Sequence, residues 1–175
     1  MTAQAPQLLL VEDDPDAAAL VRETLTDHFG ADQVLWAETV GEGVAAIDAD
    51  PLRFDLVLAD VNLPDGSGLD MISDILERRD DMPIVMITSE SGLDTAMEAI
   101  RRGAYDYVVK VGDYLFTVPL VVEKNLAVWR TKLDNVRLQE ELQQTLAELK
   151  VKNQQLEELV GQLEALASTD PLTGL

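Results

Sequence analysis

Carboxylate, hydroxyl and ammonium side chains follow four of the short apolar runs in this sequence. In chain order they are Glu12, Asp13, Asp14, Asp60, Thr88, Ser89 and Lys110. Clustered carboxylates repel one another, and a hard divalent cation with oxygen ligands relieves that repulsion. An ammonium group beside a carboxylate and Mg²⁺ is suited to hold a phosphoryl oxygen. If the chain brings these residues together, they point to Mg²⁺-dependent phosphoryl chemistry.

A structural role is the alternative for acids at the ends of strands, because Asp is a favoured N-cap of a following helix. We assign that role to Asp14, which stands directly before Pro15. Chance does not readily explain the other polar residues as a set. The functional interpretation therefore depends on whether the fold places them side by side.

Five short apolar runs are typical of strands in a parallel sheet that is covered on both faces. They are residues 8–11, 34–36, 56–59, 84–87 and 105–109. Amphipathic stretches predict the helices between them, at residues 15–29, 40–49, 69–79 and 93–102. The alternation predicts an α/β fold, a five-stranded parallel sheet with helices on both faces. In such folds the chemistry gathers at the carboxyl ends of the strands, where the polar residues stand.

The distribution of charge divides the chain into two segments. Of its 175 residues, 33 are acidic and 13 are basic, which gives a net charge of -20. Residues 1–123 hold 25 acids and 7 bases, whereas residues 124–175 hold 8 and 6. The acidic excess repels nucleic acid and anionic membranes, cysteine is absent, and no apolar run approaches the ~18 residues of a membrane span. We expect a cytoplasmic protein with no nucleic-acid or membrane partner, and a domain that ends near residue 123.

After Lys110 the pattern changes to that of one long helix. Thr117 is the predicted N-cap, because Pro119 is then tolerated in the first turn. From there to Ala167 only Gly161 would weaken a helix. A helix of about 50 residues is about 75 Å long, more than this small domain can cover. It needs a partner helix.

The heptad spacing indicates a coiled coil, and Asn153 within it suggests that the partner is a second copy of the chain. The predicted a/d seam consists of Leu142, Leu146, Leu149, Asn153, Leu156, Val160, Leu163 and Ala167. A similar stripe upstream, joined through a three-residue phase slip, consists of Leu126, Trp129, Leu133 and Val136. Asn153 at an a position favours a parallel, in-register pair, in which Lys152 faces Glu157 of the other chain. We therefore predict a homodimeric coiled coil over residues 124–168; an exposed helix with chance leucine spacing is the alternative.

Four motifs, in this order and spacing, carry a family resemblance. They are Leu-Val-Glu12-Asp13-Asp14-Pro, Val-Leu-Ala-Asp60-Val-Asn62-Leu-Pro64-Asp-Gly66, Met-Ile-Thr88-Ser89 and Tyr107-Val-Val-Lys110. Over roughly residues 7–123 the sequence resembles the receiver domains of bacterial response regulators. The resemblance implies a flavodoxin-like fold and a role in two-component signalling. A sensor histidine kinase or a phosphotransfer protein would be the partner that donates the phosphoryl group.

The resemblance also implies a role for each matching residue at the acidic edge. Asp60 would be the phosphoacceptor and a ligand of Mg²⁺. Asp13 would be a direct ligand of the same ion. Asn62 would contribute its backbone carbonyl, and Glu12 would bind through a water molecule.

The remaining matches concern the phosphoryl group and the response to it. Lys110 would pair with a phosphoryl oxygen, Thr88 would donate its hydroxyl to another, and Tyr107 would be the switch aromatic that follows. Asn62 and Glu90 occupy the positions that tune hydrolysis of the aspartyl phosphate in this family. One departure is that Val111 stands where the family usually has proline, so the loop after Lys110 is expected to differ.

The end of the chain resembles the entrance to a GGDEF diguanylate cyclase domain. The matching residues run from Asp170 to Leu175 and read Asp-Pro-Leu-Thr-Gly-Leu. We expect residues 169–175 to begin such a domain, so that the chain is a truncated receiver and linker of a cyclase and not itself an enzyme. An ordinary turn after a helix is the alternative, because Asp-Pro and Thr-Gly are common in turns.

Two other functions compete with the receiver interpretation. A Mg²⁺-dependent phosphatase of the haloacid-dehalogenase kind also uses an Asp nucleophile with Thr or Ser and Lys, but its nucleophile belongs after the first strand in an Asp-x-Asp motif. That place here reads Glu12-Asp13-Asp14-Pro15. A dimerisation module that works without phosphorylation is the second competitor, and Val111 is the feature that favours it.

Overall fold

The structure, a computed structural model, describes residues 5–30, 33–89 and 92–168. The chain forms two compact units, Met1–Arg130 and Thr131–Leu175, and each is described by itself. The predicted start of a GGDEF domain at 169–175 lies outside the described residues, as does Glu90. None of the described helices is both long and apolar enough to cross a membrane.

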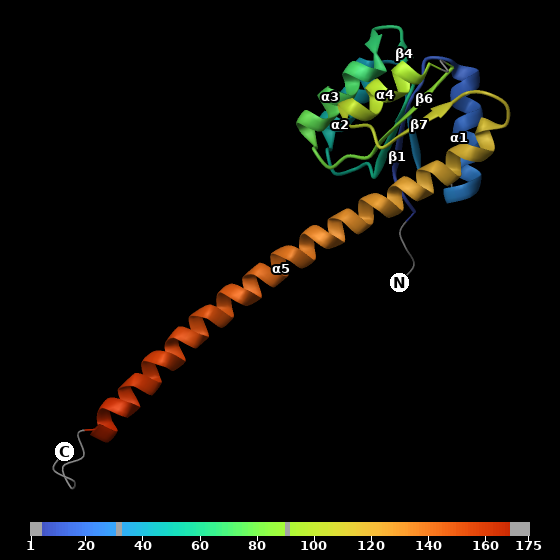
Figure 1. The fold of residues 1–175 in the computed structure, drawn as a ribbon. Coiled ribbons are helices and arrows are strands. Elements are labelled where there is room, and N and C mark those ends of the chain that lie inside the picture. The colour runs from blue at the N-terminus through green and yellow to red at the C-terminus, as the bar shows by residue number, and fades with distance from the viewer. Residues whose placement is uncertain (1–4, 31–32, 90–91, 169–175) are drawn as a thin grey trace. The chain divides into compact units, whose positions relative to one another are not determined.

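The first unit is built on a five-stranded parallel sheet (Figure 1). Its strands, in spatial order, are β2 (Val34–Ala37), β1 (Leu8–Val11), β3 (Leu56–Ala59), β6 (Ile84–Thr88) and β7 (Asp106–Val109). Counted by parallel strand, this is the order 2-1-3-4-5 of flavodoxin-like folds. The prediction of a five-stranded parallel α/β fold is confirmed.

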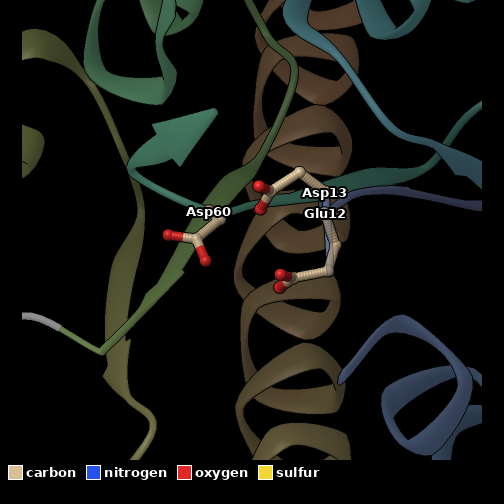
Figure 2. A group of neighbouring side chains, drawn as sticks. All are labelled: Glu12, Asp13 and Asp60. Carbon is tan, nitrogen blue, oxygen red and sulfur yellow. The ribbon is translucent and has the colours of Figure 1, made fainter. Parts of the chain in front are cut away.

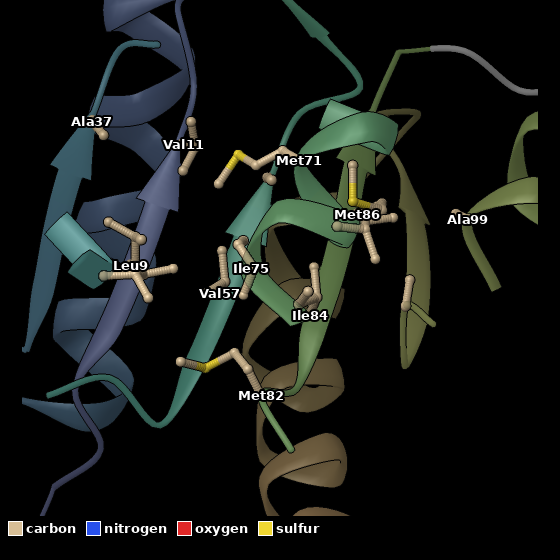
Figure 3. Packing of buried hydrophobic residues seen from close by; sticks show 14 of the residues in the cluster. Leu9, Val11, Ala37, Val57, Met71, Ile75, Met82, Ile84, Met86 and Ala99 are labelled. Atoms are coloured by element: carbon tan, nitrogen blue, oxygen red, sulfur yellow. The ribbon is translucent and has the colours of Figure 1, made fainter. Parts of the chain in front are cut away.

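Helices cover both faces of the sheet. Successive strand residues point to opposite sides, so the apolar strands place apolar side chains on both faces. Leu8 and Leu10 face α1 (Pro15–Phe29) and the first part of α5 (Tyr114–Ser168). Leu9 and Val11 belong to the opposite cluster, with residues of α2 (Val40–Ala49), α3 (Gly68–Arg78) and α4 (Leu93–Arg102). Figure 3 shows this second cluster, in which Met71 and Ile75 of α3 lie over the sheet.

Side-chain caps explain where three of the helices begin. The carboxylate of Asp14 accepts hydrogen bonds from the backbone of Asp16 and Ala17, and Pro15 takes the first helical position of α1. Thr39 caps α2 and Ser67 caps α3 in the same way. Asp14 therefore has the structural role that its place before proline predicts.

A short antiparallel hairpin that the sequence analysis did not predict follows Asp60. Its strands are β4 (Asn62–Leu63) and β5 (Gly66–Ser67). Asp65, between them, accepts hydrogen bonds from the backbone N–H groups of Val40 and Gly41 at the start of α2. The hairpin thus ties the loop after Asp60 to a neighbouring helix.

The structure corrects the predicted start of the last helix. α5 begins at Tyr114, three residues before the predicted N-cap Thr117, and Pro119 lies buried inside the helix. The reason is local: Gly112 adopts a φ of 55°, and the N–H of Phe116 donates to the carbonyl of Asp113 at 3.0 Å, which closes a turn before Thr117.

The packed part of α5 extends beyond the predicted domain boundary at residue 123. Its buried residues recur at helical spacing and are Val118, Pro119, Val122, Asn125, Leu126 and Trp129. They share one face of the helix, and the first compact unit accordingly runs to Arg130. The boundary predicted from charge alone falls inside this packed stretch.

The described part of the second unit is the remainder of α5, and none of its side chains is buried. The leucines of the predicted seam are 51–59 % exposed. The continuous helix confirms that part of the prediction, whereas the coiled-coil pairing stays a prediction.

Candidate functional site

Three carboxylates meet at the carboxyl edge of the sheet. Glu12 and Asp13 follow β1, and Asp60 follows β3, which pairs with β1 so that Val11 lies opposite Ala59. Their ligand oxygens lie within 4.8 Å of one another (Figure 2). Glu12 and Asp60 are buried, whereas Asp13 is exposed. The cluster therefore has two inner carboxylates and one outer carboxylate that is open to solvent.

Lys110 brings a positive charge into the same place. Its Nζ donates to Oε2 of Glu12 at 2.5 Å and to Oδ2 of Asp60 at 2.6 Å. Lys110 follows β7, and its backbone N–H donates to the carbonyl of Thr88 at 2.8 Å. The ammonium group of Lys110 thus joins Glu12, which lies 98 positions earlier in the chain, to Asp60, which lies 50 positions earlier.

Burial and pairing together set the protonation of this site. Burial raises the pKa of Glu12 above its ordinary value, because the hydrogen bond and the charge of Lys110 offset only part of the effect. Burial by itself lowers the pKa of Lys110, but its hydrogen bonds to Asp60 and Glu12 outweigh burial and raise that pKa above the ordinary value. Lys110 is therefore cationic at neutral pH.

Backbone contacts hold the inner carboxylates in position. The N–H of Asp60 donates to the carbonyl of Val11 at 2.9 Å, and Oδ1 of Asp60 accepts from the N–H of Asn62 at 3.1 Å. The carbonyl of Glu12 accepts from the indole N–H of Trp36 at 2.8 Å. The sequence does not reveal this role of Trp36, because no local pattern pairs it with a residue 24 positions earlier.

Gly68 is a second site residue that the sequence analysis did not identify. A Cβ on Gly68 would lie 1.9 Å from the carbonyl oxygen of Asp60 and 3.0 Å from Cε of Met86. The backbone of α3 therefore approaches Asp60 so closely that only glycine fits. By contrast, a Cβ on Gly66 in the hairpin would meet only Cγ2 of Val40, at 3.6 Å.

The family is decided by a match over the part of the chain that carries this site. A family model of the response regulator receiver domain matches residues 8–114. The chain belongs to this family. It is a receiver domain of the two-component response regulator kind.

Two named relatives match this chain over about three fifths of its length. The response regulator protein PilR of Pseudomonas aeruginosa is 39% identical over 107 residues, which are 60% of this chain and 23% of PilR. The regulatory protein LuxO of Vibrio cholerae is 40% identical over 102 residues, 58% of this chain and 21% of LuxO. The chain thus spans less than a quarter of the length of these relatives.

Solved structures agree with the fold of the receiver. NtrX from Brucella abortus superposes with a TM-score of 0.68 at 30% identity and covers 77% of this chain and 30% of NtrX. A response regulator receiver domain from Clostridium thermocellum gives a TM-score of 0.64 at 23% identity, over 73% of this chain and 98% of that domain, and this likeness shows the fold alone.

The acidic cluster of the receiver has the ligand types and spacing for a divalent cation. Carboxylate oxygens are hard ligands, and opposite ligands of Mg²⁺ stand about 4.2 Å apart at the usual bond length. The oxygens of Glu12, Asp13 and Asp60 already lie within 4.8 Å of one another. Small side-chain rotations would therefore suffice, and the exposure of Asp13 leaves room for bound water. Glu12, Asp13 and Asp60 are the described residues that could hold such an ion.

The other predicted site residues lie around this cluster. Thr88 is buried at the end of β6, directly beside the end of β7 that leads to Lys110. Tyr107 is half-buried on β7, where it packs against the apolar cluster between the sheet and α2–α4. Asn62 is exposed at the start of the hairpin that follows Asp60. Glu90, for which hydrolysis tuning is predicted, lies outside the described residues.

Val111, the departure from the family pattern, has a structural use in this receiver. Its N–H donates to the carbonyl of Val109 at 2.8 Å. That contact closes a turn of three residues, and proline has no N–H with which to make it. The described residues contain no cis peptide bond. That the loop after Lys110 differs in geometry from the family pattern stays a prediction.

Proposed function

We propose that Asp60 accepts a phosphoryl group from a sensor histidine kinase or a phosphotransfer protein, in a reaction that requires Mg²⁺. The observation that carries the proposal is the Lys110 ammonium group held between the buried carboxylates of Asp60 and Glu12. Asp13 stands beside them and is exposed, so the cluster reaches the solvent on the side of Asp13. Asp13, Asp60 and the carbonyl of Asn62 would hold the ion directly, and Glu12 through water.

The transfer follows from the chemistry of this pocket. One carboxylate oxygen of Asp60 attacks the phosphorus of a phosphohistidine; a P–O bond forms as the P–N bond breaks, and its electron pair stays on the imidazole nitrogen. Bound Mg²⁺ would offset the negative charge of the phosphoryl oxygens. Lys110 already donates to Asp60, so its Nζ can pass to a phosphoryl oxygen with little reorganisation.

The phosphorylated state would differ from the resting state in the partners of two groups. Lys110 would exchange a carboxylate oxygen for a phosphoryl oxygen, and the hydroxyl of Thr88 would donate to another. Each new charge-assisted hydrogen bond favours a rearranged state of the surrounding strands and loops. Tyr107, on the strand that leads to Lys110, would follow this movement, and Asn62 and Glu90 would set how fast water removes the phosphoryl group.

The direct test is labelling by acetyl phosphate. We expect a mass increase of one phosphoryl group in the presence of Mg²⁺, none after chelation, and none in Asp60→Asn. Asp94→Asn is the matched control, because it makes the same change at an acid on α4 that follows neither β1 nor β3. Labelling of Asp60→Asn at the rate of the unaltered chain would refute the assignment.

Turnover separates the proposal from the competing functions. As a phosphoacceptor the chain should release at most one phosphate per labelled Asp60, whereas a phosphatase of the haloacid-dehalogenase kind would hydrolyse small phosphate esters repeatedly. A chain that dimerises, takes no phosphoryl group from acetyl phosphate or a phosphorylated kinase and does not bind beryllofluoride would instead be a phosphorylation-independent module.

The second part of the proposal is a parallel homodimer through the exposed seam of α5. Its support is the row of leucines that are more than half exposed, with Asn153 among them at an a position. Two such helices would bury the leucines against each other, and the two Asn153 amides would bond across the pair. Light scattering should give twice the mass of the chain. Beryllofluoride with Mg²⁺ should change the affinity or the shape of the dimer.

The third part is the output. We propose that the dimer controls a GGDEF diguanylate cyclase domain, on the support of residues 170–175, which resemble the entrance to such a domain. A cyclase of this kind joins two GTP molecules held by two facing domains, so a dimeric linker is a suitable controller. A longer chain that continues after Leu175 should form cyclic di-GMP from GTP faster when Asp60 is phosphorylated. A longer chain that forms none would overturn this part alone.

A further inference from the structure

Trp129 is fixed by two charged residues at the amino-terminal edge of the sheet, the edge opposite to Asp60. Its indole N–H donates to Oδ2 of Asp81 at 3.1 Å, and Nε of Arg79 donates to Oδ1 of the same carboxylate at 2.8 Å. The guanidinium of Arg79 also stands over the Trp129 ring, with Cζ 5.3 Å from its centroid. Arg79 is held in turn by the carbonyls of Pro51 and Phe54, at 3.2 and 2.6 Å.

A second polar contact lies one helical turn earlier on the same face of α5. The buried Asn125 donates from Nδ2 to Oδ2 of Asp106 at 3.1 Å and to the carbonyl of Val121 at 2.8 Å. Nζ of Lys124 donates to the same oxygen of Asp106 at 3.0 Å. Because Asn125 and Trp129 are four residues apart, both contacts face the sheet side of the helix.

These polar contacts fix the orientation of α5, which apolar packing alone does not. The apolar residues of this face, Val118, Val122 and Leu126, would gain nearly the same burial if the helix turned or slid a little. The hydrogen bonds of 3.0–3.1 Å from α5 to the two carboxylates are directional, so they determine one rotation and one height of α5. Burial alone would raise the pKa values of Asp81 and Asp106, but the hydrogen bonds from these partners outweigh burial and lower both.

The same two strands connect these contacts with the phosphorylation site. Thr88 is the last residue of β6, and Asp81 stands three residues before that strand begins. Asp106 is the first residue of β7, and Lys110 directly follows its last. All five residues of β6 are buried, and the two strands are paired along their length. A shift of Thr88 or Lys110 along these strands therefore reaches Asp81 and Asp106.

We propose that Arg79, Asp81 and Asp106 form an anchor that fixes the rotation and height of α5 through Asn125 and Trp129, and that the state of Asp60 changes how firmly the anchor holds. The first half stands on the contacts alone, and the second half rests on the proposed function. The anchor is where α5 makes its last buried contact with the first unit, since Trp129 is the last buried residue of the described helix. A weaker or stronger anchor would therefore change how tightly the rotation and height of α5 are fixed at Trp129.

The first experiment tests the anchor without phosphorylation. Hydrogen exchange, read by mass spectrometry over residues 120–133, should be roughly tenfold faster in Trp129→Phe and in Asp81→Asn, because each loses a hydrogen bond to a charged group. Trp129→Phe keeps the apolar ring, so the unit still folds. Asp80→Asn is the matched control, since Asp80 is exposed and its loss of charge is the same. If both variants exchange like Asp80→Asn, the anchor does not exist.

The second experiment tests the coupling with beryllofluoride and Mg²⁺ on the full chain. In Trp129→Phe the remaining Trp36 touches the carbonyl of Glu12, so its fluorescence reports occupancy of the site. The ligand should change exchange over residues 120–133 in the unaltered chain. By linkage, a ligand that speeds this exchange must bind Trp129→Phe more tightly, and one that slows it must bind more weakly. Bound ligand with unchanged exchange and unchanged affinity would overturn the coupling alone. Failure of acetyl phosphate labelling would overturn the proposed function and the coupling that rests on it, but not the anchor.

Discussion

The two units of this chain use the same residue type in opposite ways. Leu8, Leu9 and Leu58 in the sheet of the first unit are 0% exposed, whereas Leu142 and Leu156 in the second unit are 59% and 57% exposed. The first unit thus covers the leucines of its sheet with helices on both faces. The second unit has none of its described side chains buried. The first can be stable alone, and the second needs a surface that its own residues do not supply.

The largest effect is expected from charge placed in the exposed seam. In the double variant Leu149→Glu and Leu156→Glu the proposed dimer should dissociate. Four leucines per dimer lose their burial, which removes roughly 6–12 kcal/mol at the usual value per leucine. Sedimentation should report monomers, with the urea unfolding of the first unit unchanged. Gln144→Glu, which places a charge on the outer side of the heptad, is the control and should stay dimeric. A double variant that remains dimeric would show that the two units differ less than the exposures indicate.

A cavity in the first unit should have the next largest effect. Leu58 is fully buried on β3, so Leu58→Ala should lower the free energy of unfolding of the first unit by about 2–5 kcal/mol. Denaturant unfolding followed by near-ultraviolet dichroism measures this, and light scattering at low denaturant should still report the dimer. Loss of the dimer together with this loss of stability would contradict the independence of the two units.

Adding a single Cβ atom at a glycine tests how tightly the first unit is packed. Gly68→Ala should destabilise the first unit by about 1–3 kcal/mol and slow acetyl phosphate labelling, because the added Cβ displaces the Asp60 carbonyl from which it would stand 1.9 Å. Gly66→Ala, whose Cβ has space, is the matched control and should leave both quantities almost unchanged. A full rate of labelling in Gly68→Ala would show that the approach of α3 to Asp60 is not needed.

The same substitution should have the opposite sign in the second unit. A Cβ on Gly161 meets nothing within 4 Å, and Gly161 lies on the outer side of the heptad. Gly161→Ala should therefore stabilise the helix by about 0.5–1 kcal/mol, through the lower entropy of the unfolded chain. Thermal unfolding followed by far-ultraviolet dichroism measures the gain. A loss of stability would mean that another chain contacts this side of the helix.

Most of the first unit could be predicted because its strands are short apolar runs and its helices are amphipathic. The strands at 8–11 and 56–59 and the helices at 15–29, 40–49 and 93–102 have the bounds that the sequence predicts. The start of α5 was predicted wrongly, because the turn formed by Gly112 and Asp113 depends on backbone geometry that Thr117 and Pro119 do not reveal.

The site shows the same division between local and distant information. The sequence predicts that carboxylates, Thr88 and Lys110 stand at strand ends, and a parallel sheet brings those ends to one edge. The sequence does not predict that Lys110 would bridge Glu12 and Asp60, that Trp36 would hold Glu12, or that Gly68 would lie against the Asp60 backbone. These contacts join residues from different elements.

By itself, the sequence determined the five strands of the sheet, the helices between them and the continuity of the long helix. All three depend on residues near one another in the chain, where spacing and type are visible directly. Only the tertiary structure decided which distant side chains share a hydrogen bond, including the contact of Arg79 and Asp81 with Trp129. The physical reason is that a strand or helix sets only the direction of a side chain, whereas its partner depends on how whole elements pack.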